Sequence, residues 1–374
     1  MDFARTDEQE EIAGLARRIL TDMVTEDLLR EVDKSDERFD RGVWSALADA
    51  NLLGVALPAD LGGLGLGILE QCLVLEEVGR TLAPVPVLAS IVGGALPIAE
   101  FGNAAQRDRW VPAAIDGSVI LTSALAEPGS RWPENPVTSA VAAGDGWLLE
   151  GVKTLVPAGT IANAFLVPAS TADGGVVVCI VESETPGLTI AAQRVTNRDT
   201  EALLTFDGVS VGAEAVLAGP VDGAAVLAWM IERSTIGVCA QVAGIVGRAL
   251  EMTAAYTKER IQFDRPIATF QAVGQRAADA YIDVEATKLV LLQAAWRLSE
   301  GLPATTEVEV AKFWAAEAAH RMAHTAVHLH GGTGVDVDYP IHRYFLAAKE
   351  LEFTLGGATD QLLRIGASFA ANRE

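Results

Sequence analysis

Three histidines in the last third of the sequence have the spacing of one helical face. His320, His324 and His328 are four residues apart, so on a helix they lie above one another. Imidazole nitrogens bind zinc, and this face can therefore be interpreted as a metal site, with Glu317 as the only carboxylate nearby on the same predicted helix. The alternative interpretation is a polar surface at a subunit interface or at the edge of a cofactor.

Two pairs of glycines follow these histidines. Gly331–Gly332 end one helical run, and Gly356–Gly357 end the next. Between them, Asp338, Tyr339 and Pro340 form a helix-start signal. Because glycine has no side chain, it lets the backbone approach a bound group closely. The stretch from 328 to 361 is therefore predicted to surround a cofactor.

Two other groups of residues have plainer interpretations. The run GGLGLG from Gly62 to Gly67 has the glycines of a phosphate loop, but no lysine follows it and no strand clearly precedes it. A turn between two helices is therefore favoured. Cys72, Cys179 and Cys239 lie far apart in apolar runs and are predicted to be buried, reduced thiols.

The composition is that of a globular chain with a strong negative charge. The sequence has 374 residues, 50% of them hydrophobic, and a formal net charge of −22. Such a polyanion binds nucleic acid and anionic membranes poorly. There is no apolar run of about 20 residues, so no membrane span is predicted. The acidic N-terminus lacks the apolar core of a secretory signal, and a cytoplasmic location is predicted.

The pattern changes twice along the chain and predicts three domains. Residues 1–117 are helical, beginning with Thr6 as an N-cap before DEQEEIAGLARRIL. Residues 118–217 consist of short β-branched runs separated by turn residues and predict a β-barrel-like or sandwich domain. Residues 218–374 are helical again, and the small residues Gly237, Ala240, Gly244 and Gly247 predict a central helix that a second helix approaches closely.

Four motifs in this order resemble the acyl-CoA dehydrogenase family of flavoproteins. They are GGLGLG after a proline, AEP in the first β segment, ERIQFDRPIATFQ, and HGGTGVDVDYPIHR. The resemblance runs over essentially the whole chain. It implies an α+β, mainly helical fold with an N-terminal helical domain, a middle β domain and a C-terminal four-helix bundle.

The resemblance also implies a cofactor, a reaction and partners. FAD lies between subunits of a dimer of dimers, and electrons pass on to an electron-transfer flavoprotein. A glutamate removes the α-proton of an acyl-CoA thioester while hydride leaves the β-carbon for the flavin. Members of the family hold no metal, which favours the polar interpretation of the histidine face and predicts no metal site.

The family residues that grip the diphosphate and adenosine of a neighbouring subunit's FAD are largely present. Arg260 matches the diphosphate arginine, whose guanidinium can bind phosphate through two hydrogen bonds. His328 stands where glutamine is usual, so that contact is altered but still polar. The predicted cofactor-binding residues are Arg260, Gln262, Phe263, Gln271, His328, Gly331 and Gly332.

The family residues that hold the flavin ring of the chain's own FAD are largely replaced. Ala126 stands where Thr or Ser precedes the family's Glu-Pro, and a bulkier segment, Gly129 to Pro136, replaces a glycine-rich turn. The Trp-Ile-Thr/Ser that stacks on the ring aligns with Leu155, Val156 and Pro157. Proline has neither N–H nor hydroxyl to offer the ring.

The catalytic glutamate is also absent from both positions that the family uses. Leu355 occupies the common position, and Ser234 occupies the position that a minority of the family uses. Glu352 lies three residues before Leu355 and would point elsewhere on a regular helix. Glu232 falls where aspartate is frequent, which favours a structural ion pair over a relocated base.

The favoured hypothesis is a half-site subunit of a heteromeric acyl-CoA dehydrogenase, paired as α2β2 with a paralogous chain that carries the base. The segment APVPVLAS resembles the actinobacterial branch that dehydrogenates bulky acyl-CoA thioesters such as sterol side chains. One alternative is a self-sufficient homotetramer that uses Glu232 as a relocated base. Another is a flavin-free scaffold or acyl-CoA-binding protein.

Overall fold

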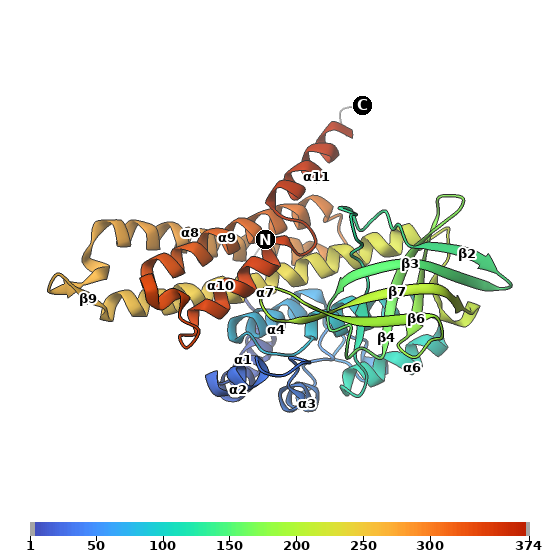
Figure 1. Cartoon of the computed structure of the whole chain (residues 1–374), viewed down its shortest axis with the longest axis horizontal. Coiled ribbons are helices and arrows are strands. Elements are labelled where there is room, and N and C mark those ends of the chain that lie inside the picture. The colour runs from blue at the N-terminus through green and yellow to red at the C-terminus, as the bar shows by residue number, and fades with distance from the viewer. Residues whose placement is uncertain (1–3, 372–374) are drawn as a thin grey trace. The chain divides into compact units, whose positions relative to one another are not determined.

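The computed structural model describes residues 4–371 and contains the helical, β and helical segments in the predicted order (Figure 1). The chain forms two compact units. One takes its residues from Met1–Glu26, Ile68–Ala83 and Thr235–Glu374, and the other from Asp27–Gly67 and Pro84–Ser234. The predicted α+β, mainly helical fold class is confirmed.

The first unit is helical. Its helices are α1 (Asp7–Met23), α4 (Ile68–Thr81), most of α7 (Gly223–Glu259), α8 (Gln271–Ser299), α9 (Thr305–His330), α10 (Ile341–Phe353) and α11 (Ala358–Ala371). A hairpin of β9 (Ile261–Gln262) and β10 (Arg265–Pro266) joins α7 to α8. Thr6 caps α1 as predicted, because its side chain accepts from Gln9 N while the Gln9 side chain accepts from Thr6 N.

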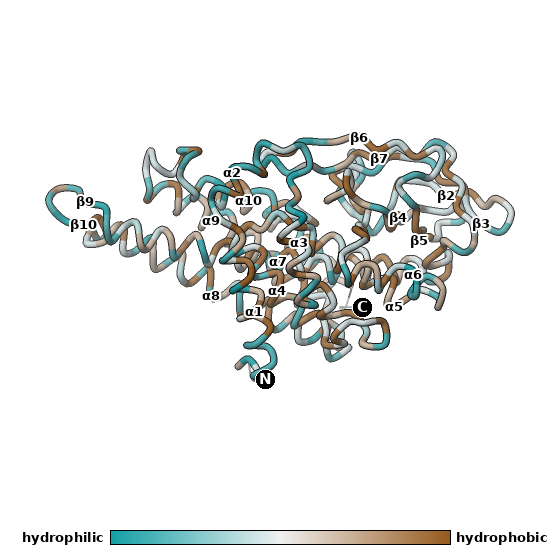
Figure 2. The backbone as a smooth tube through the Cα atoms, turned by 90° about the horizontal axis from the view of Figure 1, so that it is seen from below, coloured by the Kyte–Doolittle hydropathy of each residue, from teal (hydrophilic) through white to brown (hydrophobic). Residues whose placement is uncertain are grey.

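Gly244 of α7 has the predicted packing role, whereas a Cβ on Gly247 would meet nothing within 4 Å. A Cβ on Gly244 would lie 1.9 Å from the carbonyl oxygen of Glu76 on α4, and one on Gly79 of α4 would lie 2.1 Å from that of Gln241. The two helices therefore touch backbone to backbone at this crossing. On α8, hydrophobic and hydrophilic residues are interspersed (Figure 2), and Tyr281, Ile282 and Leu289 remain exposed.

The second unit is built around an eight-stranded sheet. Seven strands follow the order β6-β7-β3-β2-β4-β5-β8, and β1 pairs in parallel with β4. Their bounds are β1 Leu121–Ser123, β2 Ser139–Ala143, β3 Gly146–Val156, β4 Ala164–Thr171, β5 Val176–Glu182, β6 Leu188–Arg194, β7 Thr200–Val211 and β8 Val216–Ala218. The helices of this unit include α2 (Glu26–Val32), α3 (Arg41–Asp49), a π-helix (Leu88–Ala95), α5 (Leu96–Phe101) and α6 (Ala104–Ile115).

The three cysteines are free and buried, as predicted. Burial raises the pKa of Cys179 and of Cys239 to about 12 and that of Cys72 well above its usual value. Among the described residues, α7 alone is long and apolar enough for a membrane span, but 67% of its apolar window is buried in the protein. Core helices commonly have this property.

Candidate functional site

Arg260 presents a free guanidinium at the end of α7. Its backbone N–H donates to the carbonyl of Tyr256 at 2.8 Å, and its carbonyl accepts from Ile267 N at 2.9 Å. Its side chain is exposed and has no hydrogen bond or ion pair within residues 4–371. The backbone is thus fixed while the guanidinium remains available for an anion.

The tip of the β9–β10 hairpin holds an aromatic ring in solvent. Phe263 and Asp264 have φ angles of 52° and 60°, a left-handed region that bulky residues seldom adopt. Phe263 is 87% exposed, and its ring touches Phe270 edge-on at 6.2 Å between centroids. Gln262 is exposed beside it. A strained backbone that keeps a phenyl ring exposed is typical of a binding element whose contact comes from another molecule.

The other cofactor residues lie at the start of α8 and the end of α9. Gln271 begins α8, and its side chain is exposed. His328 is exposed on the last turn of α9, just before Gly331 and Gly332. Gly331 has a φ of 61°, and a Cβ on either glycine would meet nothing within 4 Å. These glycines therefore border open space, although the Gly331 N–H already donates to the carbonyls of Val327 and His328.

Two aromatic residues that the motif analysis did not single out tie these segments together. Tyr256, one turn before Arg260 on α7, stacks on His330 at the end of α9 with ring centroids 4.3 Å apart. The Tyr256 hydroxyl also donates to the carbonyl of His330 at 3.3 Å. His330 is 3% exposed, and burial lowers its pKa, so it is a neutral structural residue. This contact places Arg260 near Gly331.

In the sheet unit, the segment aligned with the flavin-ring contacts offers few polar groups. Leu155 has a φ of 50° and is 47% exposed, while its N–H donates to the Gln193 side chain at 2.9 Å. Val156 is 1% exposed. The carbonyl of Pro157 accepts from the Thr122 hydroxyl at 2.8 Å. The backbone N–H and carbonyl are thus already engaged, and the side chains are apolar.

The altered turn before this segment is fastened by a buried ion pair. Glu127 accepts hydrogen bonds from the N–H groups of Val137 and Thr138, which closes the loop that contains Gly129 to Pro136. Lys153 Nζ forms an ion pair with Glu127 Oε1 at 2.7 Å, without the direction of a hydrogen bond. Burial lowers the pKa of Lys153 to about 8.

The turn between α10 and α11 keeps a well-ordered backbone around Leu355. Leu355 has a φ of 58° and is followed by Gly356 at 99°. The buried Gln361 side chain donates to the carbonyls of both residues, at 3.1 and 3.3 Å. The fully buried Lys312 donates to the carbonyls of Leu351 and Glu352, both at 3.1 Å. None of these bonds involves the side chain of Leu355.

The carboxylates near the two base positions have partners. Glu352 lies between Lys349, at 2.5 Å, and His320, at 3.3 Å. Glu232 lies 3.6 Å from Arg233, and its role as a structural ion pair stays a prediction. Ser234 is 7% exposed, and its hydroxyl has no hydrogen-bond partner within residues 4–371.

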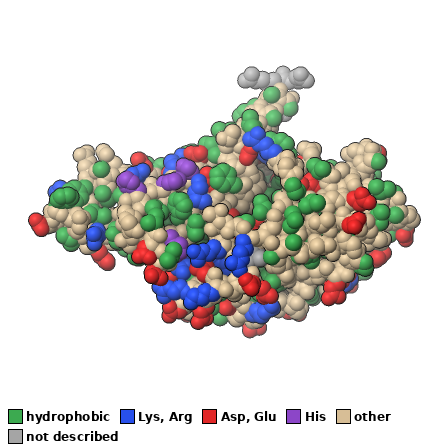
Figure 3. Space-filling view, in the orientation of Figure 1, with side chains coloured by type: hydrophobic (Ala, Val, Ile, Leu, Met, Phe, Trp, Pro, Cys, Tyr) green, Lys and Arg blue, Asp and Glu red, His purple; other side chains and the backbone are tan. Residues whose placement is uncertain are grey.

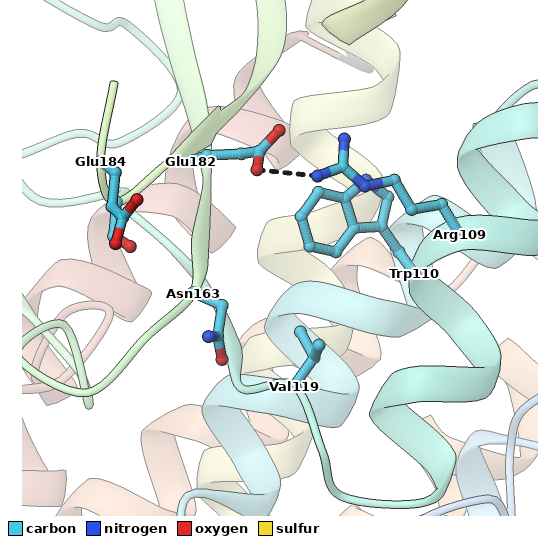
Figure 4. Close-up of a pocket in the computed structure, with 7 residues that line it drawn as sticks. Arg109, Trp110, Val119, Asn163, Glu182 and Glu184 are labelled. Atoms are coloured by element: carbon cyan, nitrogen blue, oxygen red, sulfur yellow. Dashed lines mark hydrogen bonds and ion pairs between the residues drawn. The ribbon is translucent and has the colours of Figure 1, made fainter. Parts of the chain in front are cut away.

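Neither a metal-binding cluster nor the pocket of the sheet unit joins the predicted site residues in the described part of the chain. Within residues 4–371, no group of three or more His, Cys, Asp and Glu side chains is placed to hold a metal ion. A shallow pocket in the sheet unit (Figure 4) is lined by Arg109, Trp110, Val119, Asn163, Glu182, Ser183 and Glu184. Arg109 pairs with Glu182 there at 2.7 Å. The pocket contains none of the predicted site residues.

The fold and these motifs define an FAD-dependent oxidoreductase class, and sequence comparison identifies it. Residues 6–118 match the acyl-CoA dehydrogenase N-terminal domain, and residues 221–370 match the acyl-CoA dehydrogenase C-terminal domain. The chain belongs to the acyl-CoA dehydrogenase family, whose cofactor is FAD.

Particular relatives are similar over their whole length. The chain is 46% identical to acyl-CoA dehydrogenase FadE27 of Mycobacterium tuberculosis, over 99% of both chains. It superposes with a TM-score of 0.94 on a chain of the ChsE4-ChsE5 complex from Mycobacterium tuberculosis, at 46% identity and 99% coverage of both. The TM-score with a Tcur3481-Tcur3483 steroid acyl-CoA dehydrogenase variant is 0.92 at 44% identity, and the match covers 98% of this chain and 99% of that one.

Proposed function

We propose that this chain is one subunit of a heteromeric acyl-CoA dehydrogenase and lends half of an FAD site to a paralogous partner. Arg260, Gln271 and the Gly331–Gly332 backbone hold the diphosphate and adenosine of that FAD, with Gln262, Phe263 and His328 beside them. The partner supplies the ring contacts, the base and the acyl pocket. The FAD, when bound, accepts the hydride from the β-carbon.

One contrast supports this proposal above all. The dinucleotide half has a free, exposed arginine and glycines that border open space. The ring half has Leu155 and Pro157 with their backbone groups already bonded, and Leu355 stands at the base position. Random decay would damage both halves, whereas a shared site preserves only the half that the partner needs.

Relatives suggest the partner and the substrate class. Two similar structures are the ChsE4-ChsE5 complex and the Tcur3481-Tcur3483 steroid acyl-CoA dehydrogenase, and each name contains two proteins. We therefore propose a bulky acyl-CoA thioester, such as a steroid side chain, as the substrate of the complex. An electron-transfer flavoprotein is the proposed electron acceptor, and the cytoplasm the proposed location.

The test is purification of this chain alone and with a co-expressed paralogue that has the glutamate. The complex is expected to contain FAD and to oxidise acyl-CoA, while the lone chain does neither. Stoichiometric FAD and acyl-CoA oxidation by the lone chain would overturn the proposal in favour of a self-sufficient enzyme. A flavin-free complex would favour the scaffold alternative.

Restoring the carboxylate should not restore activity. In Leu355→Glu, the turn should stay folded, because its hydrogen bonds come from Gln361 and Lys312 and not from the side chain at 355. The new base should find no correctly held flavin ring, since Leu155 and Pro157 provide no side-chain donor to it. The measurement is acyl-CoA oxidation by the lone variant with added FAD. Measurable turnover would mean that only the base had been lost.

A further inference from the structure

A cluster of cationic and neutral hydrogen-bond donors covers one face of the helical unit. Figure 3 shows histidines beside lysine and arginine over α9 and α10. Arg276 on α8 and His320 and His324 on α9 are exposed, and the two imidazole rings lie 4.6 Å apart. Arg276 has no hydrogen bond or ion pair in the described chain. We refer to Arg276, His320 and His324 as the donor face.

Most of the carboxylates around this region are already paired. Asp283, with an 11% exposed side chain, receives two hydrogen bonds from Arg321, at 2.7 and 2.8 Å. Arg321 also pairs with Glu317 at 2.5 Å. Glu352, with a 12% exposed side chain, pairs with Lys349 at 2.5 Å. Asp279, exposed on α8 three residues beyond Arg276, forms no ion pair with it in the described structure.

The Nε2–H group of His320 is available as a hydrogen-bond donor at the surface. Its Nδ1 lies 3.1 Å from Lys349 Nζ and 3.3 Å from Glu352 Oε1. Since an ammonium group only donates, the neutral imidazole accepts at Nδ1 and carries its proton on Nε2. Half of the His320 side chain is exposed, so this N–H is accessible to a partner's acceptor. All three members of the donor face thus offer N–H groups to a partner.

We propose that the donor face receives carboxylates of the subunit that shares the FAD half-site. On a chain of net charge −22, an exposed cluster of hydrogen-bond donors is complementary to an acidic protein surface. The face also continues the half-site, because His328 lies one helical turn beyond His324 on the same side of α9. The proposal rests on the proposed function for the existence of that neighbouring subunit.

Protonation of His324 should tighten this contact. Burial, then His320 and Lys349, hold the pKa of His324 below its usual value, and Arg276 acts in the same direction while Glu352 opposes it. His320 Nδ1 lies 3.1 Å from Lys349 Nζ and 3.3 Å from Glu352 Oε1. Glu317 and Arg321 lie within one turn of His320 on α9 and pair with each other. A partner's carboxylate would favour the protonated imidazole of His324.

The test uses the co-purified complex. Subunit dissociation is measured by mass photometry at pH 6 and pH 8, for wild type and for the variant Arg276→Gln/His320→Gln/His324→Gln. Surface ion pairs contribute little each, so the triple variant should weaken association by about tenfold at pH 6. Wild type should bind several-fold more tightly at pH 6 than at pH 8, and the variant should lose this difference. Arg18→Gln, an exposed arginine on α1, is the matched control and should behave as wild type.

The outcomes separate this inference from the proposed function. Equal association and equal pH dependence in wild type and triple variant would overturn the donor-face assignment, even if the complex contains FAD. If the shared half-site is formed by a second copy of this chain, the proposed function fails. The same measurement on that homomer still decides the donor face. Weakening by Arg18→Gln to the same extent would show a general charge effect and overturn the assignment.

Discussion

Replacing Arg260 by Met should leave the complex assembled but remove its FAD. The guanidinium is exposed and forms no hydrogen bond or ion pair within residues 4–371, so its loss should barely change folding. Two charge-assisted hydrogen bonds to a diphosphate contribute about 1.5–3 kcal/mol each. FAD affinity should therefore fall by at least about a hundredfold.

The measurement is flavin absorbance per complex after gel filtration, together with acyl-CoA oxidation at low and saturating FAD. Activity should return as FAD is raised, because the partner's base and acyl pocket are untouched. Arg265→Met is the matched control on the same hairpin. Its guanidinium lies over the Phe270 ring, 4.2 Å from the centroid, so its role is packing. Full flavin content in Arg260→Met would refute the half-site.

The outcome would also distinguish the alternatives that the sequence left open. A scaffold would contain no flavin before or after the substitution. A homotetramer would lose flavin, and it would also oxidise acyl-CoA without any partner. The lone chain and the complex therefore need to be measured side by side.

Much of this architecture was predictable because its causes are local in sequence. Thr6 and Gln9 lie within one turn, and their capping box follows from residue type and spacing. The face of small residues on α7 predicted a close contact with another helix, and Gly244 makes this contact with α4. The family motifs located Arg260 and the glycine pair, because each motif is a continuous segment.

Other features depend on contacts between distant segments, which no local pattern records. Lys312 appears as one lysine in a helix, yet it holds carbonyls 39 and 40 residues away. Tyr256 and His330 are 74 residues apart and stack only after folding. The left-handed backbone at Leu155 and Leu355 was equally hidden, because leucine gives no sign of a positive φ.

The backbone conformation at Leu155 and Leu355 also bears on the evolution of this chain. A backbone conformation that costs leucine free energy occurs at both positions that the resemblance aligns with ring binding and proton removal. The polar side chains expected at these positions are absent, while the positive-φ turns are present. Such a combination is expected when selection acts on the fold as an assembly partner and no longer on the chemistry of this chain.

The second large effect should come from Glu201, which no motif indicated. It lies at the start of β7 opposite Gln193 and is 8% exposed, and its Oε2 has no partner in the described part of the chain. Burial and the nearby Asp199 raise its pKa from 4.5 to about 7. Between these two values the folded chain retains a proton that the unfolded chain releases.

The sign of the effect follows from this difference. Stability is highest below the unfolded pKa and is lost as pH rises towards 7, where the buried carboxylate becomes charged. The shift corresponds to about 3 kcal/mol. Glu201→Gln keeps the shape of the side chain and removes its charge. It should therefore raise the free energy of unfolding at pH 7.5 by up to about 3 kcal/mol. At pH 4.5 it should change the free energy of unfolding little.

Urea unfolding of the full chain at fixed protein concentration, at pH 4.5, 6 and 7.5, measures this effect. Asp199 should leave a residual slope in the variant, because burial raises its pKa as well. Glu184→Gln, at an exposed carboxylate in the same unit, is the control and should change nothing. Equal curves for wild type and Glu201→Gln would mean that Glu201 is solvated or paired in solution. A higher stability of the variant at pH 7.5 would instead identify a carboxylate that the fold retains at a cost at the start of β7.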